Sequence, residues 1–190
     1  MSNVGLYLGT FNPIHNGHVI LAKYFSKIPE LDEVLVVLSP QSPFKRGNDL
    51  IDDLDRLKMA ETVFKKYKNI KVSDIEFKMS KPNFTIDTLK EFKKRHKYDN
   101  LILLIGEDNL IGFNKWKDYK KIIEIAEVYV YPRNTNQKIP DEIITNSNIK
   151  LVDAPKIKIS SSQIRELIKS KKSIDTLVPK EVLRFFELNK

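Results

Sequence analysis

Short apolar runs of strand length alternate with helix-like stretches through most of the chain, and this alternation restricts the possible folds most strongly. The runs lie at residues 4–8, 34–38, 70–72, 101–105, 128–131 and 149–152. Apolar strands that alternate with helices are typical of parallel sheets covered on both faces. We therefore predict an α/β protein with a Rossmann-like, doubly wound parallel sheet, helices on both faces and right-handed crossovers.

The stretches between the runs have the apolar spacing of amphipathic helices. Helices are expected over 19–25 and about 85–97, from about Ser161 and Lys180, and over a stretch that has Leu54, Leu57, Ala60 and Phe64 on one face. Residues 75–77 are expected to extend the third strand after a kink, and 134–148 to form a polar surface excursion. With 190 residues, the chain is expected to form a single domain over 1–190.

The composition is that of a soluble globular protein, with 41% hydrophobic and 31% charged residues. The chain has no cysteine, which excludes a disulfide framework and a thiolate zinc site. It has neither the pattern of a signal peptide nor an apolar run near the roughly 18–20 residues that span a bilayer. We therefore expect a cytoplasmic protein without a membrane partner.

The chain is basic, because 33 Lys and Arg residues against 25 Asp and Glu residues give a formal net charge of +8. A basic surface attracts phosphorylated ligands and can also hold nucleic acid. Most of the excess, however, is lysine on expected helix faces, as at 65–68 and 93–97. Solvated helix faces explain such lysines, and no aromatic platform for a single strand is recognisable. We expect no nucleic-acid partner.

Two histidines, His15 and His18, lie between the first apolar run and the helix that follows it. In such a turn, backbone N–H groups and the positive end of the helix dipole favour an anion, to which imidazole can donate hydrogen bonds. Gly9 permits a close backbone approach, Pro13 stiffens the turn, and Gly17 admits the chain into the helix. The turn therefore suits a polyphosphate; alternatively, both histidines only cap and pack the first helical turn.

Other polar segments also follow expected strands, and the carboxyl ends of parallel strands share one edge of a sheet, where ligands bind. These segments are 39–46, with Lys45 and Arg46, and 106–109, 132–133 and 158–165. The serines of the last segment, together with Arg165, suit phosphate oxygens, although one of them also suits a helix cap. Gly106 and Asp108 suit a ribose diol, although a surface acid is the more common use of such an Asp.

Two motifs together carry a family resemblance. The run 9–18 and the run 159–165 resemble the paired signature of the HxGH nucleotidyltransferases. Residues 42–45, 84–89, 105–110 and Trp116 further resemble the bacterial nicotinate mononucleotide adenylyltransferases. The resemblance implies adenylyl transfer from ATP to nicotinate mononucleotide, giving nicotinate adenine dinucleotide and pyrophosphate in NAD biosynthesis.

The resemblance also implies roles for individual residues. The implied catalytic residues are His15, His18, Lys45 and Arg165. The implied ATP-binding residues are Gly9, Thr10, Phe11, His15, Gly17, His18, Gly106, Asp108, Ile159, Ser161, Ser162 and Arg165. The implied nicotinate mononucleotide-binding residues are Asn12, Lys45, Phe84, Thr85, Trp116 and Arg133. Mg²⁺ is expected to arrive with ATP, without a dedicated protein metal site.

The chain departs from the family pattern at several positions. Leu8 stands where the family usually has glycine, Asn12 where it has aspartate, Phe84 where it has tyrosine and Lys117 where it has an aromatic residue. Ser-Pro-Phe-Lys at 42–45 replaces Pro-Pro-His-Lys. Phosphopantetheine adenylyltransferase, which generally has threonine at the position of His15, and nicotinamide mononucleotide adenylyltransferase remain alternatives, and a basic nucleic-acid-binding protein is a third.

Overall fold

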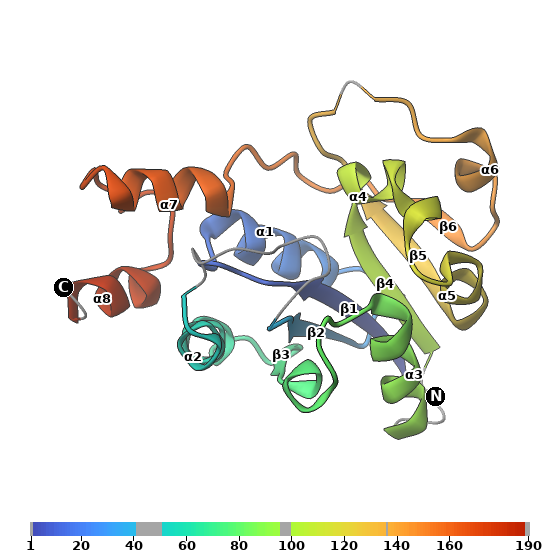
Figure 1. Cartoon of the computed structure of the whole chain (residues 1–190), viewed down its shortest axis with the longest axis horizontal. Coiled ribbons are helices and arrows are strands. Elements are labelled where there is room, and N and C mark those ends of the chain that lie inside the picture. Colours follow the sequence, from blue (N-terminus) through green and yellow to red (C-terminus); the bar gives the residue numbers. More distant parts are fainter. Residues whose placement is uncertain (1, 41–50, 96–99, 136, 189–190) are drawn as a thin grey trace.

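One parallel sheet forms the centre of the protein. In the computed structural model, residues 2–40, 51–95, 100–135 and 137–188 are described. Within them, six strands pair in the order β3-β2-β1-β4-β5-β6, and every pairing is parallel. The strands are β1 (Asn3–Gly9), β2 (Glu33–Leu38), β3 (Ile70–Ser73), β4 (Asn100–Gly106), β5 (Ala126–Tyr131) and β6 (Ile149–Leu151). This arrangement, drawn in Figure 1, confirms the predicted Rossmann-like fold.

Helices cover both faces of the sheet because the strands are apolar on both sides. The first core packs α1 (Asn16–Phe25), α2 (Asp53–Phe64), α7 (Ser161–Lys169) and α8 (Lys180–Leu188) on one face. The second packs α3 (Thr85–Arg95), α4 (Glu107–Ile111), α5 (Tyr119–Ile125) and α6 (Asp141–Ile144) on the other. Alternate residues of β4 divide between the cores: Leu104 joins the first, and Leu103 and Ile105 join the second.

Three expectations differ from the structure. Residues 75–77 were expected to extend the third strand, but they lie in a 3-10 helix, η1 (Ile75–Lys78), which is closed by a hydrogen bond from Phe77 N to Asp74 O. Leu54 is 57% exposed because it lies in the first turn of α2, where Asp52 caps the helix. The excursion 134–148 contains α6, and its Ile139 and Ile143 are buried in the second core.

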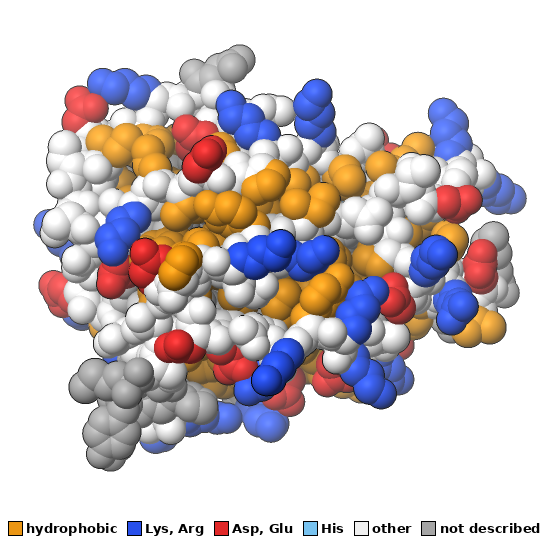
Figure 2. Space-filling view, turned by 180° about the vertical axis from the view of Figure 1, so that it is seen from behind, with side chains coloured by type: hydrophobic (Ala, Val, Ile, Leu, Met, Phe, Trp, Pro, Cys, Tyr) orange, Lys and Arg blue, Asp and Glu red, His pale blue; other side chains and the backbone are white. Residues whose placement is uncertain are grey.

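Positively charged side chains are spread over the face of the protein that Figure 2 shows. On the face drawn in Figure 2, Lys and Arg side chains alternate with acidic and apolar ones. Several lysines are engaged in exposed ion pairs, such as Lys66 with Glu181 and Lys150 with Glu127. No helix within the described ranges is both long enough and apolar enough to cross a membrane.

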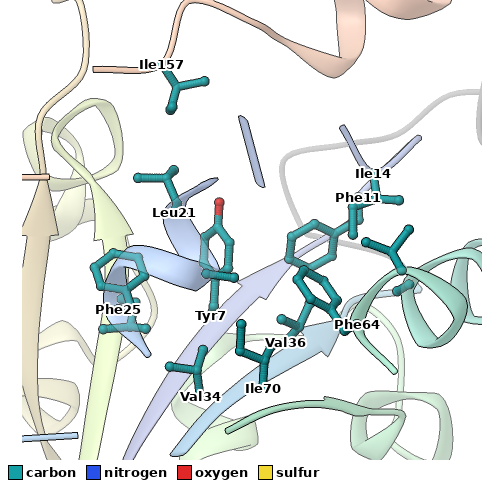
Figure 3. Close-up of a cluster of buried hydrophobic side chains, with 14 of the residues drawn as sticks. Tyr7, Phe11, Ile14, Leu21, Phe25, Val34, Val36, Phe64, Ile70 and Ile157 are labelled. Atoms are coloured by element: carbon teal, nitrogen blue, oxygen red, sulfur yellow. The ribbon is translucent and has the colours of Figure 1, made fainter. Parts of the chain in front are cut away.

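The loop after β1 is anchored in the first core. Phe11 and Ile14 are buried there, and Figure 3 shows them beside Phe64 of α2. A second anchor is polar: the guanidinium of Arg56 in α2 is fully buried and donates to the carbonyl oxygens of Thr10 and Ser39.

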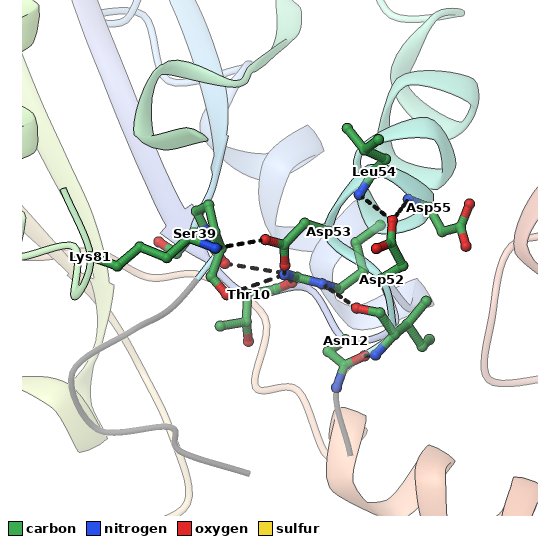
Figure 4. A network of polar contacts seen from close by, with 11 residues as sticks. Thr10, Asn12, Ser39, Asp52, Asp53, Leu54, Asp55 and Lys81 are labelled. Carbon is green, nitrogen blue, oxygen red and sulfur yellow. Dashed lines mark hydrogen bonds and ion pairs between the residues drawn. The ribbon is translucent and has the colours of Figure 1, made fainter. Parts of the chain in front are cut away.

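Arg56 makes further hydrogen bonds that tie the start of α2 to the same place. It donates to the carbonyl oxygens of Ile51, at 3.0 Å, and Pro40, at 3.3 Å, and it pairs with the carboxylate of Asp53. Asp53 in turn pairs with Lys81, at 3.1 Å, and Figure 4 shows the network. The sequence reading gave Arg56 no role.

Replacing Arg56 by methionine should destabilise the protein strongly. The substitution leaves several buried carbonyl oxygens without a donor, so we expect a loss of about 3–5 kcal/mol, the scale for removing one partner of a buried ionic network. Urea unfolding followed by circular dichroism measures the loss. The matched control is Arg95→Met, which removes an exposed pair with Glu91 and should cost less than about 1 kcal/mol. Equal losses in the two variants would contradict the role of Arg56.

Candidate active site

The two histidines form a reciprocal cap at the start of α1. His15 is the N-cap residue, and its Nδ1 accepts from the backbone N–H of His18 at 3.3 Å. The Nδ1 of His18 accepts from the backbone N–H of His15 at 3.2 Å. The rings stack, with centroids 3.6 Å apart and planes 19° apart. Because each Nδ1 accepts a hydrogen bond, the ring hydrogen lies on Nε2 in both residues. The helix cap, which the sequence left open as the alternative to a polyphosphate site, is therefore present in the structure.

His15 is uncharged near neutral pH. Its side chain is buried, and burial is the main reason that its pKa falls to about 3, with the positive charge of Arg133 as a second cause. Both effects disfavour the protonated ring. His15 can therefore offer an N–H donor to an anion but no positive charge.

The loop that leads to the histidines is tightly packed. Phe11 has φ of 43°, in the left-handed region, and its ring stands edge-on to His18 with centroids 4.9 Å apart. A Cβ on Gly9 would lie 3.0 Å from the Phe11 ring, so a side chain there would press on it. Asn12 is buried, and its Oδ1 accepts from Ile51 N at 3.0 Å. Asn12 therefore fixes the loop to the start of α2.

Gly17 serves packing rather than backbone freedom. No glycine in the described part of the chain has a positive φ, so the expectation that Gly17 eases the chain into the helix is wrong. A Cβ at this position would instead collide with the side chain of Ile157. Gly17 thus allows the segment before α7 to lie against the start of α1.

The serine and arginine motif near the C-terminal end of the chain meets the histidine turn. Ser160 caps α7, because its hydroxyl accepts from Gln163 N. Ser161 Oγ donates to Pro13 O at 3.1 Å, and Arg165 Nη1 donates to Asn12 O at 2.9 Å. Arg165 Nη2 also reaches Ser162 Oγ at 3.2 Å. The structure thus brings together two motifs separated by about 150 residues in the chain.

Asp108 and Arg133 lie together at the end of β4. A Cβ on Gly106 would collide with Asp108 Oδ1, so a side chain there would displace the Asp108 carboxylate from this position. Arg133 Nε lies 3.7 Å from Asp108 Oδ1, and Arg133 Nη1 donates to Ile157 O at 3.4 Å. Sequence reasoning grouped Arg133 with Phe84 and Trp116. The structure places Arg133 beside Asp108 and close enough to His15 to affect its pKa.

A cavity of about 430 Å³ lies beside the end of β1. The described residues that line it include three of the six predicted mononucleotide-binding residues, and residues of β1, β4 and β5. They are Tyr7, Leu8, Gly9, Thr10, Ser39, Glu76, Asn83, Phe84, Thr85, Leu103, Leu104, Ile105, Asn109, Lys115, Trp116, Lys117, Ile122 and Tyr131. The structure therefore brings Phe84, Thr85 and Trp116 together with Gly9 and Thr10. Lys45 lies outside the described residues.

Sequence reasoning missed a buried polar cluster in the wall of this cavity. Thr88 Oγ1 donates to Glu76 Oε1 at 2.7 Å, and Asn83 Nδ2 donates to Glu76 O at 3.1 Å. Burial raises the pKa of the Glu76 carboxyl, although hydrogen bonds from Thr88 and Ser39 oppose this shift. The Asn83 Oδ1 atom is buried without a hydrogen-bond partner. Only the closeness of Asn83 to the Phe84-Thr85 motif could have indicated the cluster.

Acid should destabilise the protein through His15. Between the folded pKa of about 3 and the ordinary value of 6.5, the unfolded chain binds more protons at this position, so stability rises with pH. The contribution approaches about 1.4 kcal/mol for each pH unit within this window. His15→Asn keeps a capping oxygen near the position of Nδ1 and should remove this contribution. Urea unfolding across the window measures both proteins, and identical pH slopes would contradict the assignment.

Known proteins resemble this chain over nearly its whole length. The Cytidylyltransferase-like family model matches residues 6–167. A Flavobacterium psychrophilum protein named probable nicotinate-nucleotide adenylyltransferase is 40% identical, covering 97% of this chain and 95% of the relative. A relative of the same name from Christiangramia forsetii is 41% identical, with 97% and 95% coverage. A solved structure with a similar fold is the nicotinic acid mononucleotide adenylyltransferase of Plasmodium falciparum, complexed with NaAD. Its TM-score is 0.83 and its sequence identity 22%, and the match covers 100% of this chain and 97% of that chain. The chain therefore belongs to the cytidylyltransferase-like family and, within it, to the nicotinate-nucleotide adenylyltransferases.

Proposed function

We propose that this protein transfers the adenylyl group of ATP to nicotinate mononucleotide, forming nicotinate adenine dinucleotide and pyrophosphate. One observation carries the proposal: Ser161 and Arg165 are hydrogen-bonded to the loop that leads to His15 and His18, beside a cavity that Trp116 lines. Two sets of phosphate-binding groups next to a pocket for a planar ring fit two nucleotide substrates. The names of relatives about 40% identical support the same substrates.

In the proposed reaction, a 5′-phosphate oxygen of nicotinate mononucleotide bonds to the α-phosphorus of ATP, and the bond from that phosphorus to pyrophosphate breaks. Positioning and charge stabilisation suffice for such a transfer, so no covalent enzyme intermediate is needed. His15 and His18 donate from Nε2 to the reacting phosphates. Ser161, Ser162 and Arg165 hold the departing pyrophosphate, with Lys45 assisting.

The remaining residues position the two nucleosides. Gly106 and Asp108 hold the adenosine ribose, and Trp116 stacks on the nicotinate ring. The backbone N–H of Thr85 binds the ring carboxylate. Mg²⁺ carried by ATP would neutralise part of the phosphate charge, and phosphate oxygens and water would supply most of its ligands. Within the described residues, no group of three or more His, Asp or Glu side chains is placed to hold a metal ion. We propose the cytoplasm as the location of this activity.

A comparison of acceptors tests the function. ATP is mixed in turn with nicotinate mononucleotide, nicotinamide mononucleotide and phosphopantetheine, and pyrophosphate is measured. Backbone N–H donors pair with a carboxylate but face the NH₂ of an amide. We therefore expect kcat/KM for nicotinate mononucleotide to exceed that for nicotinamide mononucleotide by about an order of magnitude or more. With phosphopantetheine as the acceptor, no pyrophosphate should be released from ATP. Lack of reaction with nicotinate mononucleotide would overturn the function, and equal use of acid and amide would overturn only the selectivity.

His18→Asn separates the catalytic role of His18 from its capping role. The asparagine oxygen can accept from His15 N as Nδ1 does, so stability should stay near that of the wild type. The loss of the Nε2–H donor should lower kcat by roughly 10²–10³-fold. His18→Ala is the matched comparison, because it removes donor and cap together and should also cost about 1 kcal/mol of stability. Near-normal kcat in the asparagine variant would reduce His18 to a helix cap.

A further inference from the structure

Three positions at which this chain departs from the family pattern line one cavity. Leu8, Phe84 and Lys117 all contribute to its wall, next to Trp116. Phe84 lies directly before α3, and Lys117 follows η2 (Phe113–Lys115), so the two residues belong to separate segments of the chain. The departures thus concentrate where the second substrate is proposed to bind.

Lys117 joins these two segments directly. Its Nζ lies 2.8 Å from Asp87 Oδ2, in the first turn of α3. The same Nζ lies 4.6 Å from the centroid of the Phe84 ring, within the range of a cation–π contact. One ammonium group, next to Trp116 in the chain, therefore contacts both an anion and an aromatic ring of the segment at the start of α3. The aromatic residue that is usual at this position carries no positive charge, so it can form neither the ion pair nor the cation–π contact.

The ammonium of Lys117 is already neutralised by a close anion. Asp87 also lies at the N-terminal turn of α3, where the helix dipole favours its negative charge. A paired cation has a weak field at a distance, and 46% of the Lys117 side chain is exposed, so solvent screens it further. The bridge therefore acts by holding two backbone segments together rather than by attracting the substrate.

We propose that Lys117 is a positioning residue that sets substrate specificity, because it holds the Phe84–Thr85 segment and the Trp116–Lys117 segment together in the cavity wall. This inference rests on the proposed function for its substrate, since the two segments enclose the ring of the mononucleotide. The link between the segments keeps the indole of Trp116 and the N–H of Thr85 in register with a planar ring that carries a carboxylate. It lowers the conformational cost of binding that substrate.

Four variants test the bridge by kinetics. Lys117→Met keeps the stem and removes the ammonium, Asp87→Asn removes the anion, and Lys117→Arg keeps a cation that reaches Asp87 and Phe84. Lys138→Met is the control, because it breaks a surface pair of similar length, 3.0 Å from Asp141. In Lys117→Met and Asp87→Asn, KM for nicotinate mononucleotide should rise about 5- to 10-fold, whereas KM for ATP and kcat should change less than about twofold. Lys117→Arg and the control should resemble the wild type.

Two results decide whether Lys117 positions the cavity wall or attracts the substrate by its charge. They are the KM of the variant that combines Lys117→Met with Asp87→Asn, and the direction in which Asp87→Asn changes KM. If the bridge positions, Lys117→Met combined with Asp87→Asn should be no worse than either single change. If the charge of Lys117 acts on the substrate itself, Asp87→Asn should instead lower KM for the acid and leave the amide unaffected. That outcome, or an unchanged KM in both single variants, would overturn the proposal.

A second measurement needs no substrate. Trp116 is the only tryptophan of the chain, so intrinsic fluorescence reports on one wall of the cavity. Acrylamide should quench Trp116 more strongly in Lys117→Met and Asp87→Asn than in the wild type, Lys117→Arg or Lys138→Met. Equal quenching in all five proteins would overturn the positioning role. If the wild type fails to use nicotinate mononucleotide, the proposed function falls, and this measurement still decides whether the bridge holds the wall.

Discussion

The geometry of the site depends on one buried guanidinium. Burying an arginine carries a large desolvation cost, which is offset here because Arg56 directs its donors at carbonyl oxygens and a carboxylate that are themselves buried or partly buried. Two of those carbonyls belong to Thr10 and Ser39, which directly follow β1 and β2 and line the cavity. Apolar packing has no directional preference, so by itself it would not fix the positions of the segments that follow β1 and β2. Arg56 instead fixes the two chain segments by hydrogen bonds with defined directions.

The reciprocal cap explains the spacing of the two histidines. A capping box joins the N-cap residue to the residue three positions later, and His15 and His18 have that separation. An imidazole has two nitrogens that are separated by one ring carbon and point in different directions, so one can cap the helix while the other carries the hydrogen. Capping and ligand binding, which sequence reasoning treated as alternatives, are therefore compatible in the same residue.

The sequence predicted what depends on local pattern and failed where contacts are distant. The strands were predictable because runs such as 101–105 are apolar on both sides, and their carboxyl ends predicted the edge that carries the site. Helices α4, α5 and α6 are only five, seven and four residues long, too short to show a helical period. Arg56 looked like an ordinary charge on a helix, since its carbonyl partners lie up to 46 residues away. Glu76 and Asn83 are brought to the cavity by η1 and the turn before α3, neither of which was predicted.

The low pKa of His15 determines what else can occupy the space beside it. A positively charged imidazole would bind an anion more strongly, but it would also repel any cation that the anion carries. A neutral ring donates its hydrogen to the anion without this repulsion. The burial that keeps His15 uncharged therefore makes this end of α1 tolerant of an anion and its counterion together.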